Sequence, residues 1–151
     1  MEIDKIGQKG ENRVKIRKAE PKDKKAISEL YYQLYPEHKG PKEIIPIEVL
    51  EAKSLLFLAE EKKKPIGFVW GTFINYGISK YGYIDELFVE KEFRRQGIGT
   101  SLVKTILEEL KKLKAWAIFI STSEGNMQVR TFYNKFGFRL CKGPWLYKET
   151  K

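Results

Sequence analysis

The most constraining feature of this sequence is a predicted strand that leads through a short charged turn into a strongly amphipathic helix. The strand is expected over residues 81–89, and the turn after it runs Arg94-Arg95-Gln96-Gly97-Ile98-Gly99. Apolar residues then recur at helical spacing, namely Ile98, Leu102, Val103, Ile106, Leu107, Leu110 and Leu113. This unit predicts an α/β arrangement in which the apolar face of the helix packs on a sheet.

The other segments alternate between strand-like and helix-like patterns. Further strands are expected at 14–17, 55–59, 66–75, 117–121, 138–141 and 145–148, and further helices at 21–34, near 48–52 and at 126–135. The predicted order is therefore β-α-α-β-β-β-α-β-α-β-β. Because a short polar turn joins 55–59 to 66–75, these two strands are expected to form an antiparallel hairpin. Hairpins mixed with crossovers predict one α/β domain with a mixed sheet.

The length of 151 residues suits one domain. Residues 1–12 are polar, contain glycine and show no sustained period, so a flexible N-terminal tail is expected there. The single folded domain is then expected over 13–151.

Composition excludes several classes of protein. No run of about 18 apolar residues is present, so a transmembrane helix is not expected, and the first residues lack the apolar stretch of a secretory signal. Cys141 is the only cysteine and His38 the only histidine, which rules out a disulfide scaffold and the usual zinc site. A cytoplasmic protein without a metal is expected.

The net charge of +9 favours anionic partners such as nucleic acid, a membrane surface or a phosphate-rich cofactor. The alternative is that abundant lysine and glutamate form an ion-pair-rich surface with no particular partner.

The glycine turn is a candidate phosphate site. Glycines allow a ligand close to the backbone, and the first N–H groups of a helix, together with its dipole, attract phosphate. Neither familiar phosphate motif fits, since Leu102 replaces the third glycine of a dinucleotide fingerprint and no lysine follows Gly99 as in a P-loop. Without further context, an ordinary tight turn is the alternative.

The stretch from Ile84 through Gly99 resembles the acetyl-CoA-binding segment of the GNAT superfamily of N-acetyltransferases. The pattern of that family is Arg/Gln-x-x-Gly-x-Gly/Ala, which Arg94, Gly97 and Gly99 satisfy. The run from Asn126 to Phe138 is similar to the second signature of the family. The resemblance implies a GNAT-like fold, an acetyltransferase domain over 13–151, and acetyl-CoA as the acyl donor.

The resemblance also implies site residues. The cofactor-binding residues it implies are Leu87, Phe88, Val89, Arg94, Arg95, Gln96, Gly97, Ile98, Gly99, Thr100, Asn126 and Tyr133. In this family the strand before the turn binds pantetheine through its main chain, the residue at Asn126 contacts the CoA arm, and Tyr133 protonates the departing thiolate. A phenol with a reference pKa of about 10 is neutral at working pH and can donate that proton. The alternatives are a helix cap for Asn126 and a packed aromatic ring for Tyr133.

Asp85 and Glu86 are the candidate bases. Consecutive strand residues point to opposite faces, so only one of them is expected to reach the acceptor. Asp85 is preferred, because it aligns with an acidic position that several small-amine acetyltransferases use. The alternative is that both are solvated charges at a strand end.

The sequence thus predicts an acetyl-CoA-dependent N-acetyltransferase in which a primary amine attacks the thioester directly. No cysteine lies in either motif, which argues against an acyl-enzyme. The acceptor stays open between a small amine and a peptide or protein amine, and a homodimer is compatible with the family. The alternatives are a non-catalytic acyl-CoA sensor of the same fold and a basic nucleic-acid-binding module, although the lysines are scattered. Cys141 and Tyr31 are expected to pack in the core, and His38 is expected to be exposed. The resemblance also implies that the first helices border the acceptor cleft, so one of Tyr31, Tyr32 and Tyr35 is expected to contact the acceptor.

Overall fold

The computed structural model of the chain describes residues 3–6, 14–37, 55–75, 80–122, 125–141 and 148. The chain divides into two compact units, Met1–Ile120 and Ser121–Lys151. The first unit holds the sheet and two helices, and the second holds one helix. In the described part of the chain, no helix is long and apolar enough to cross a bilayer.

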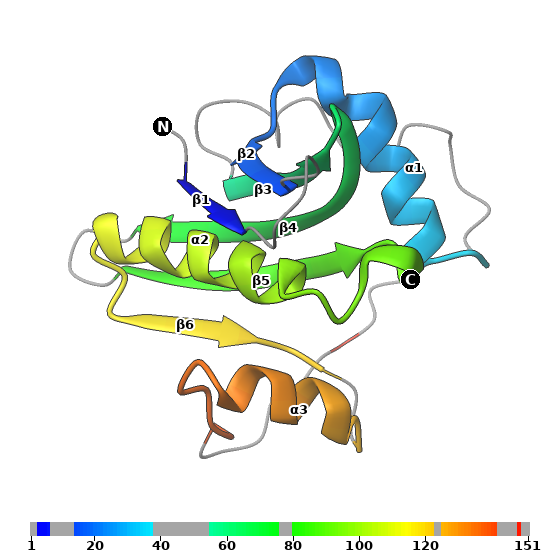
Figure 1. The fold of residues 1–151 in the computed structure, drawn as a ribbon. Coiled ribbons are helices and arrows are strands. Elements are labelled where there is room, and N and C mark those ends of the chain that lie inside the picture. The colour runs from blue at the N-terminus through cyan, green and yellow to red at the C-terminus, as the bar shows by residue number, and fades with distance from the viewer. Residues whose placement is uncertain are drawn as a thin grey trace. The chain divides into compact units, whose positions relative to one another are not determined.

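The first unit is built on a six-stranded mixed sheet, whose strands follow one another in chain order (Figure 1). The strands are β1 (Ile3–Ile6), β2 (Val14–Lys18), β3 (Leu55–Glu61), β4 (Lys64–Asn75), β5 (Lys80–Val89) and β6 (Ala117–Ile120). The pairs from β1 to β5 are antiparallel, and β5 pairs with β6 in parallel. A parallel pair needs a crossover, which helix α2 (Ile98–Lys112) provides.

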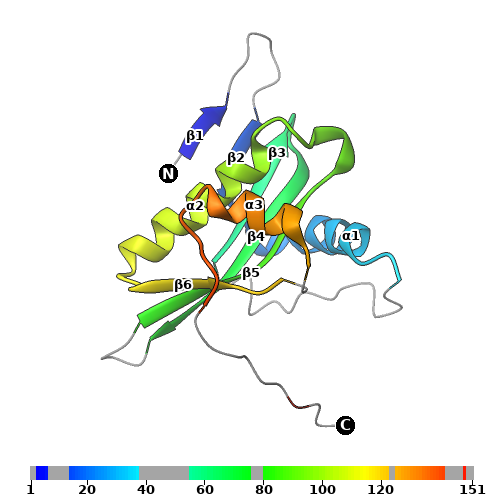
Figure 2. The same ribbon diagram turned by 90° about the horizontal axis from the view of Figure 1, so that it is seen from below.

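The two helices of this unit cover opposite faces of the sheet (Figure 2). Helix α2 lies so close to β4 and β5 that a Cβ at Gly82 would come within 2.5 Å of Leu110, and one at Gly71 within 2.5 Å of Ile106. Helix α1 (Lys24–Leu34) begins after the short 3-10 turn η1 (Pro21–Asp23). Its apolar side completes a buried cluster made of Ala19, Ile27, Leu30, Leu56, Leu58, Phe68 and Phe88.

Most of the predicted elements are confirmed, with β2, α1, the β3–β4 hairpin, β5, α2 and β6 close to their expected ranges. Helix α3 (Met127–Asn134) in the second unit also matches its prediction, and Gly137 after it is left-handed, with φ of 85°. The expected helix near 48–52 lies outside the described residues.

Two predictions of local structure are wrong. Residues 3–6, expected to belong to a tail, form β1, because they pair with β2; four residues are too few for a visible period. Residues 138–141, expected as a strand, have no regular structure. Their apolar pattern is not enough, since a strand requires a paired neighbour, and no described strand pairs with them. The last predicted strand falls at 145–148, of which only residue 148 is described, outside any strand.

The hairpin turn between β3 and β4 is unusual in its residues. Lys62 and Lys63 connect the paired Glu61 and Lys64, and both lysines have left-handed backbones, with φ of 48° and 66°. Two-residue turns of this kind favour Asn-Gly, because side chains with a Cβ are strained at positive φ. We expect the double variant Lys62→Asn/Lys63→Gly to raise the free energy of unfolding by about 1 kcal/mol, measured by urea denaturation. Lys62→Gln/Lys63→Gln removes the same charges without relieving the backbone, so an equal gain in that control would refute the explanation.

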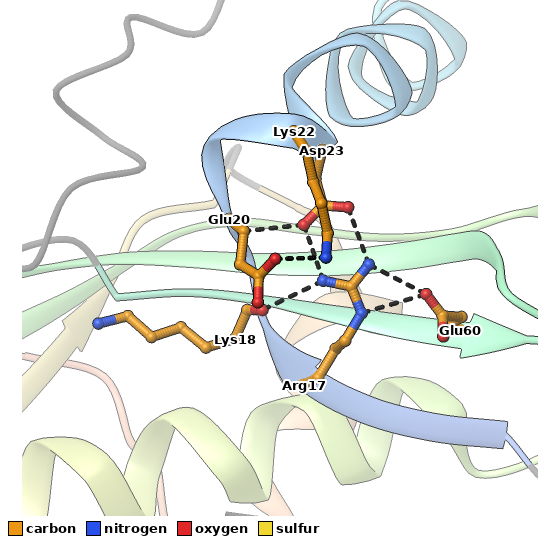
Figure 3. A network of polar contacts seen from close by, with 6 residues as sticks. All are labelled: Arg17, Lys18, Glu20, Lys22, Asp23 and Glu60. Atoms are coloured by element: carbon orange, nitrogen blue, oxygen red, sulfur yellow. Dashed lines mark hydrogen bonds and ion pairs between the residues drawn. The ribbon is translucent and has the colours of Figure 1, made fainter.

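An ion-pair network ties β2 to η1 and β3 (Figure 3). The guanidinium of Arg17 binds both oxygens of Asp23, at 2.7 and 2.8 Å, and Oε2 of Glu60 at 3.0 and 3.1 Å. Asp23 also accepts from the backbone N–H of Glu20 at 2.8 Å. Burial alone would raise the pKa of Asp23, but the hydrogen bonds from Arg17 and Glu20 outweigh burial and hold this pKa below its ordinary value.

This network predicts an acid-sensitive contribution to stability. Because the pKa of Asp23 is lower in the folded state, the stabilisation is present above about pH 4 and is lost as the pH falls through the folded-state pKa. We expect Arg17→Met to lower the free energy of unfolding by about 2 kcal/mol near pH 7, since it leaves a mostly buried carboxylate without its cation. The difference from the parent protein should shrink below pH 4 in denaturation curves. Lys22→Ala removes the exposed pair with Glu20 and a minor charge effect on Asp23, so its effect near pH 7 should be far smaller than that of Arg17→Met.

Candidate active site

The site is organised by a β-bulge in β5. Trp70 of β4 is paired with Glu86, and the next residue, Gly71, is paired with Ile84, so Asp85 is an extra residue without a partner on β4. Before the bulge, Gly82 faces helix α2; after it, Phe88 belongs to the buried cluster on the side of α1. Because a bulge inserts one extra residue, even-numbered residues face α2 before Asp85 and face α1 after it.

The bulge places both candidate carboxylates on the α1 side of the sheet. Thr72 lies two positions after Trp70 on β4, so both share the face that packs against α1. Its hydroxyl donates to Oδ2 of Asp85 at 2.7 Å, while Glu86 is the direct partner of Trp70. The expectation that the two carboxylates point to opposite faces is therefore wrong, because strict alternation fails at a bulge, and which of them reaches the acceptor stays a prediction.

Helix α1 supplies the partner of Glu86. The hydroxyl of Tyr35, the residue that ends α1, donates to Oε1 of Glu86 at 2.7 Å. The Tyr35 ring lies 4.9 Å from the Tyr31 ring, and Tyr31 packs against the buried cluster, as expected. The sequence offered Tyr35 only as one of three tyrosines near the acceptor and gave no sign of this contact, since its partners are 51 positions apart.

Burial changes the acidity of these groups. It raises the pKa of Asp85, although the hydrogen bond from Thr72 acts in the opposite direction. Burial and the neighbouring charge of Asp85 raise the pKa of Glu86, which the hydrogen bond from Tyr35 partly offsets. Burial and the bond to Glu86 raise the pKa of Tyr35, so this phenol stays protonated. A carboxylate with a raised pKa is a stronger base than one in water, which suits proton removal from an ammonium group.

The same strand presents an open edge. Strand β6 pairs with β5 only from Tyr81 to Ile84, and no other described strand lies along residues 85–89 on that side. The N–H of Glu90 donates to Ile66 on β4. Because backbone groups alternate in an antiparallel pair, those of Leu87 and Val89 face away from β4 toward this edge. An extended ligand can bind such an edge as an added strand.

The turn after β5 leads to a helix N-terminus that no side chain caps. The first helical hydrogen bond of α2 runs from Ser101 to the carbonyl of Gly97, so three N–H groups precede it without an intrahelical partner. Gly97 is left-handed, with φ of 80°, and a Cβ there would meet no atom within 4 Å. The turn therefore has open space beside uncapped donors, which suits a phosphate.

The side chains around this turn have different roles. Arg94 is exposed, donates from Nε to the carbonyl of Val89 at 2.8 Å, and places its guanidinium 5.6 Å from the Phe88 ring centre. Arg95 is exposed and left-handed, with φ of 60°. The side chain of Ile98 is buried in the core, so only its backbone can face a ligand. Of the other predicted residues, Gln96 donates to the carbonyl of Glu92 at 3.3 Å, and Gly99 and Thr100 are half-buried in the first turn of α2.

The second unit carries the other two predicted residues. Asn126 caps α3, since its Oδ1 accepts from the N–H of Val129 at 3.2 Å. Tyr133 is buried, with its ring 5.0 Å from Phe132 and 5.4 Å from Phe138. Both structural alternatives are thus confirmed, and a role for either residue toward CoA stays a prediction.

The sequence predicts Cys141 in the core and His38 at the surface. Cys141 is exposed, so its expected place in the core is wrong: residues 138–141 join no described strand that would bury it. His38 lies outside the described residues. Within the ranges that the structure describes, no three His, Cys, Asp or Glu side chains gather as metal ligands would.

Comparison with known proteins gives a consistent result. Residues 24–138 match the model of the acetyltransferase (GNAT) family. The chain is 31% identical over 93 residues to N-alpha-acetyltransferase 30 of Dictyostelium discoideum, covering 62% of this chain and 50% of that protein. It is 35% identical over 75 residues to the protein of the same name in Schizosaccharomyces pombe, covering 50% and 49%. The matches thus span about half the length of these curated relatives.

Solved structures agree on the fold. The chain superposes on an aminoglycoside N-acetyltransferase, AAC(6')-Iy in complex with CoA, with a TM-score of 0.79 and 19% sequence identity. The match covers 96% of this chain and 100% of that structure.

Proposed function

The chain belongs to the acetyltransferase (GNAT) family and has its fold, and from this premise we propose that it transfers an acetyl group from acetyl-CoA to a primary amine. The observation that carries the proposal is the open edge of β5 beside the uncapped N-terminus of α2. An extended pantetheine fits the first, and a pyrophosphate fits the second. The carboxylates of Asp85 and Glu86 lie on the same strand.

We assign the donor to the residues from Leu87 to Thr100. The backbone groups of Leu87 and the N–H of Val89 would bind the pantetheine arm, since the Val89 carbonyl already accepts from Arg94, and an N–H at this edge would polarise the thioester carbonyl. The N–H groups at the start of α2 would bind the pyrophosphate, with Arg94 and Arg95 adding positive charge. The side chain of Asn126 would contact the CoA arm, by resemblance to the family.

The reaction requires a base and an acid. The acceptor reaches the enzyme as an ammonium ion, and Asp85 or Glu86 takes its proton. The amine nitrogen then bonds to the thioester carbon, the C–S bond breaks, and the thiolate takes a proton from Tyr133. The carboxyl group formed in the first step passes its proton to solvent, and the regenerated carboxylate then takes the extra proton of the new amide and passes it to solvent as well. Solvent reprotonates Tyr133, so the whole reaction releases one proton for each acetyl group transferred.

The acceptor class is a primary amine, either a small molecule or the amine of a peptide or protein. The relatives named above carry N-alpha-acetyltransferase and aminoglycoside acetyltransferase names, and both kinds of acceptor present such an amine. We place the activity in an acetyltransferase domain over 13–151, to whose sheet residues 3–6 add strand β1.

Isothermal titration tests the proposal. The protein is titrated with acetyl-CoA, with desulfo-CoA as the non-reacting analogue and with ATP as a phosphate control. We expect both CoA compounds to bind and ATP not to bind. Failure of both CoA compounds would overturn the proposed function, and equal binding of ATP would show only a general anion site.

A further inference from the structure

The two carboxylates at the bulge differ in how firmly they are held. Asp85 is an exposed residue whose partner, Thr72, is also exposed. Glu86 is half-buried, and its partner Tyr35, although exposed itself, caps the C-terminus of α1, whose buried side belongs to the core. A general base must be held within hydrogen-bond reach of the proton it removes, so a carboxylate that is tied to a packed helix as well as to its own strand is the better suited of the two.

The contact with Tyr35 leaves one oxygen of Glu86 for the acceptor. The hydroxyl binds Oε1, and no described side chain donates to Oε2. The backbone N–H of Tyr35 donates to the carbonyl of Tyr31, so the ring that carries this hydroxyl is fixed to the last turn of α1. Glu86 also directly precedes Leu87, whose backbone faces the open edge. Glu86 is therefore the residue next to the start of the edge assigned to the thioester.

On the basis of the proposed function, we propose that Tyr35 is a positioning residue: its hydroxyl holds one oxygen of Glu86, so that the other oxygen takes the proton from the acceptor amine. Glu86 is then the catalytic base, and Asp85 is a neighbouring charge that favours binding of the cation. This differs from the expectation that Asp85 is the base. The two carboxylates differ because Glu86 alone is bound by Tyr35 at the end of α1. This contact cannot be read from the sequence.

The groups that face Glu86 in the described residues are few. They are Tyr35 and Tyr31 from α1 and Asp85 from β5, while its partner on β4, Trp70, is uncharged. Loss of the Tyr35 hydroxyl removes the contact that favours the charged form of Glu86. The pKa of Glu86 should then rise further, while that of Asp85 should hardly change.

The first test needs no acceptor. The side-chain carboxyl groups are labelled with carbon-13 and titrated by NMR in the parent protein, in Tyr35→Phe and in Thr72→Val. Tyr35→Phe retains the ring against Tyr31 and should raise the pKa of Glu86 only. Thr72→Val is the matched control and should raise the pKa of Asp85 only. An unchanged Glu86 titration in Tyr35→Phe would overturn the positioning role.

The second test identifies the base. Thiol release from acetyl-CoA is followed against pH with spermidine, benzylamine and a peptide with a free N-terminal alanine, and the fastest acceptor is used for the variants. In Tyr35→Phe the acidic limb of kcat/KM should move to higher pH and the rates should converge with the parent at high pH. Glu86→Gln should lower kcat/KM about 100-fold. A limb that moves with Thr72→Val instead would make Asp85 the base and overturn the inference.

The experiments can contradict the proposed function and the role of Tyr35 independently of each other. Absence of acetyl-CoA binding in the parent protein would contradict the proposed function. Binding of acetyl-CoA with a pH profile indifferent to Tyr35→Phe would leave the proposed function intact and contradict only the role of Tyr35.

Discussion

Gly97→Glu is expected to weaken acetyl-CoA binding by at least about 100-fold, equivalent to about 2.8 kcal/mol, while the protein remains folded. The new carboxylate would stand beside the uncapped N–H groups of α2, where we place the pyrophosphate. It would both repel the phosphates and occupy the open space over the turn, since no atom lies within 4 Å of a Cβ at this position. Titration calorimetry measures the affinity, and circular dichroism checks the fold.

Two controls separate the causes of this loss. Gly97→Gln has the same size and the same backbone penalty without the charge, so it should bind acetyl-CoA more tightly than the glutamate variant. Gly137→Glu carries the charge at another left-handed glycine with open space, with φ of 85°, and it should retain affinity close to that of the parent. If Gly97→Glu binds acetyl-CoA as the parent does, the phosphate does not lie at this turn.

Tyr133→Phe should lower kcat by about 100-fold, the usual lower range for loss of a general acid. The affinity for acetyl-CoA should change by less than about threefold, because the proton is donated only as the C–S bond breaks. The ring would keep its packing against Phe132 and Phe138, so the variant should lose less thermal stability than one that lacks the ring. Steady-state kinetics and titration calorimetry, run on the same preparation, provide both numbers.

A second variant separates loss of the Tyr133 hydroxyl from loss of packing by its ring. Tyr133→Leu removes the ring as well as the hydroxyl, and because the ring is buried it should also lower the melting temperature. If Tyr133→Phe already loses as much stability as Tyr133→Leu, its rate defect reflects packing. If the phenylalanine variant turns over at the parent rate, the thiolate takes its proton from another donor.

Local patterns in the sequence were enough to predict most of the elements. The apolar spacing from Ile98 to Leu113 predicts α2 to within a residue, because the buried face of a helix produces a regular spacing of apolar residues in its own sequence. The glycine turn was likewise found from Gly97 and Gly99. Both signals are local. The structure confirms the turn, since Gly97 adopts a left-handed backbone that favours glycine.

The arrangement of the acidic pair was not predictable in the same way. Residues 84–86 contain neither glycine nor proline, so nothing local indicates the bulge at Asp85. The bulge depends on two distant requirements, the contact of Gly82 with α2 and the burial of Phe88 on the other face. The contact of Tyr35 with Glu86 also joins residues 51 positions apart. Such features follow from tertiary packing, which a local period does not contain.

The bulge has a consequence for how the length of this strand can vary. A deletion at Asp85 would restore regular alternation, and the residues on one side of it would exchange faces. Either Gly82 would turn from Leu110, presenting Tyr81 or Tyr83 to a helix that approaches too closely for any side chain, or Phe88 would leave the core. A deletion elsewhere in a surface loop would be absorbed locally. The number of residues in β5 is thus as restricted as their identity. The side chain at position 85 can be replaced far more easily than the residue itself can be deleted.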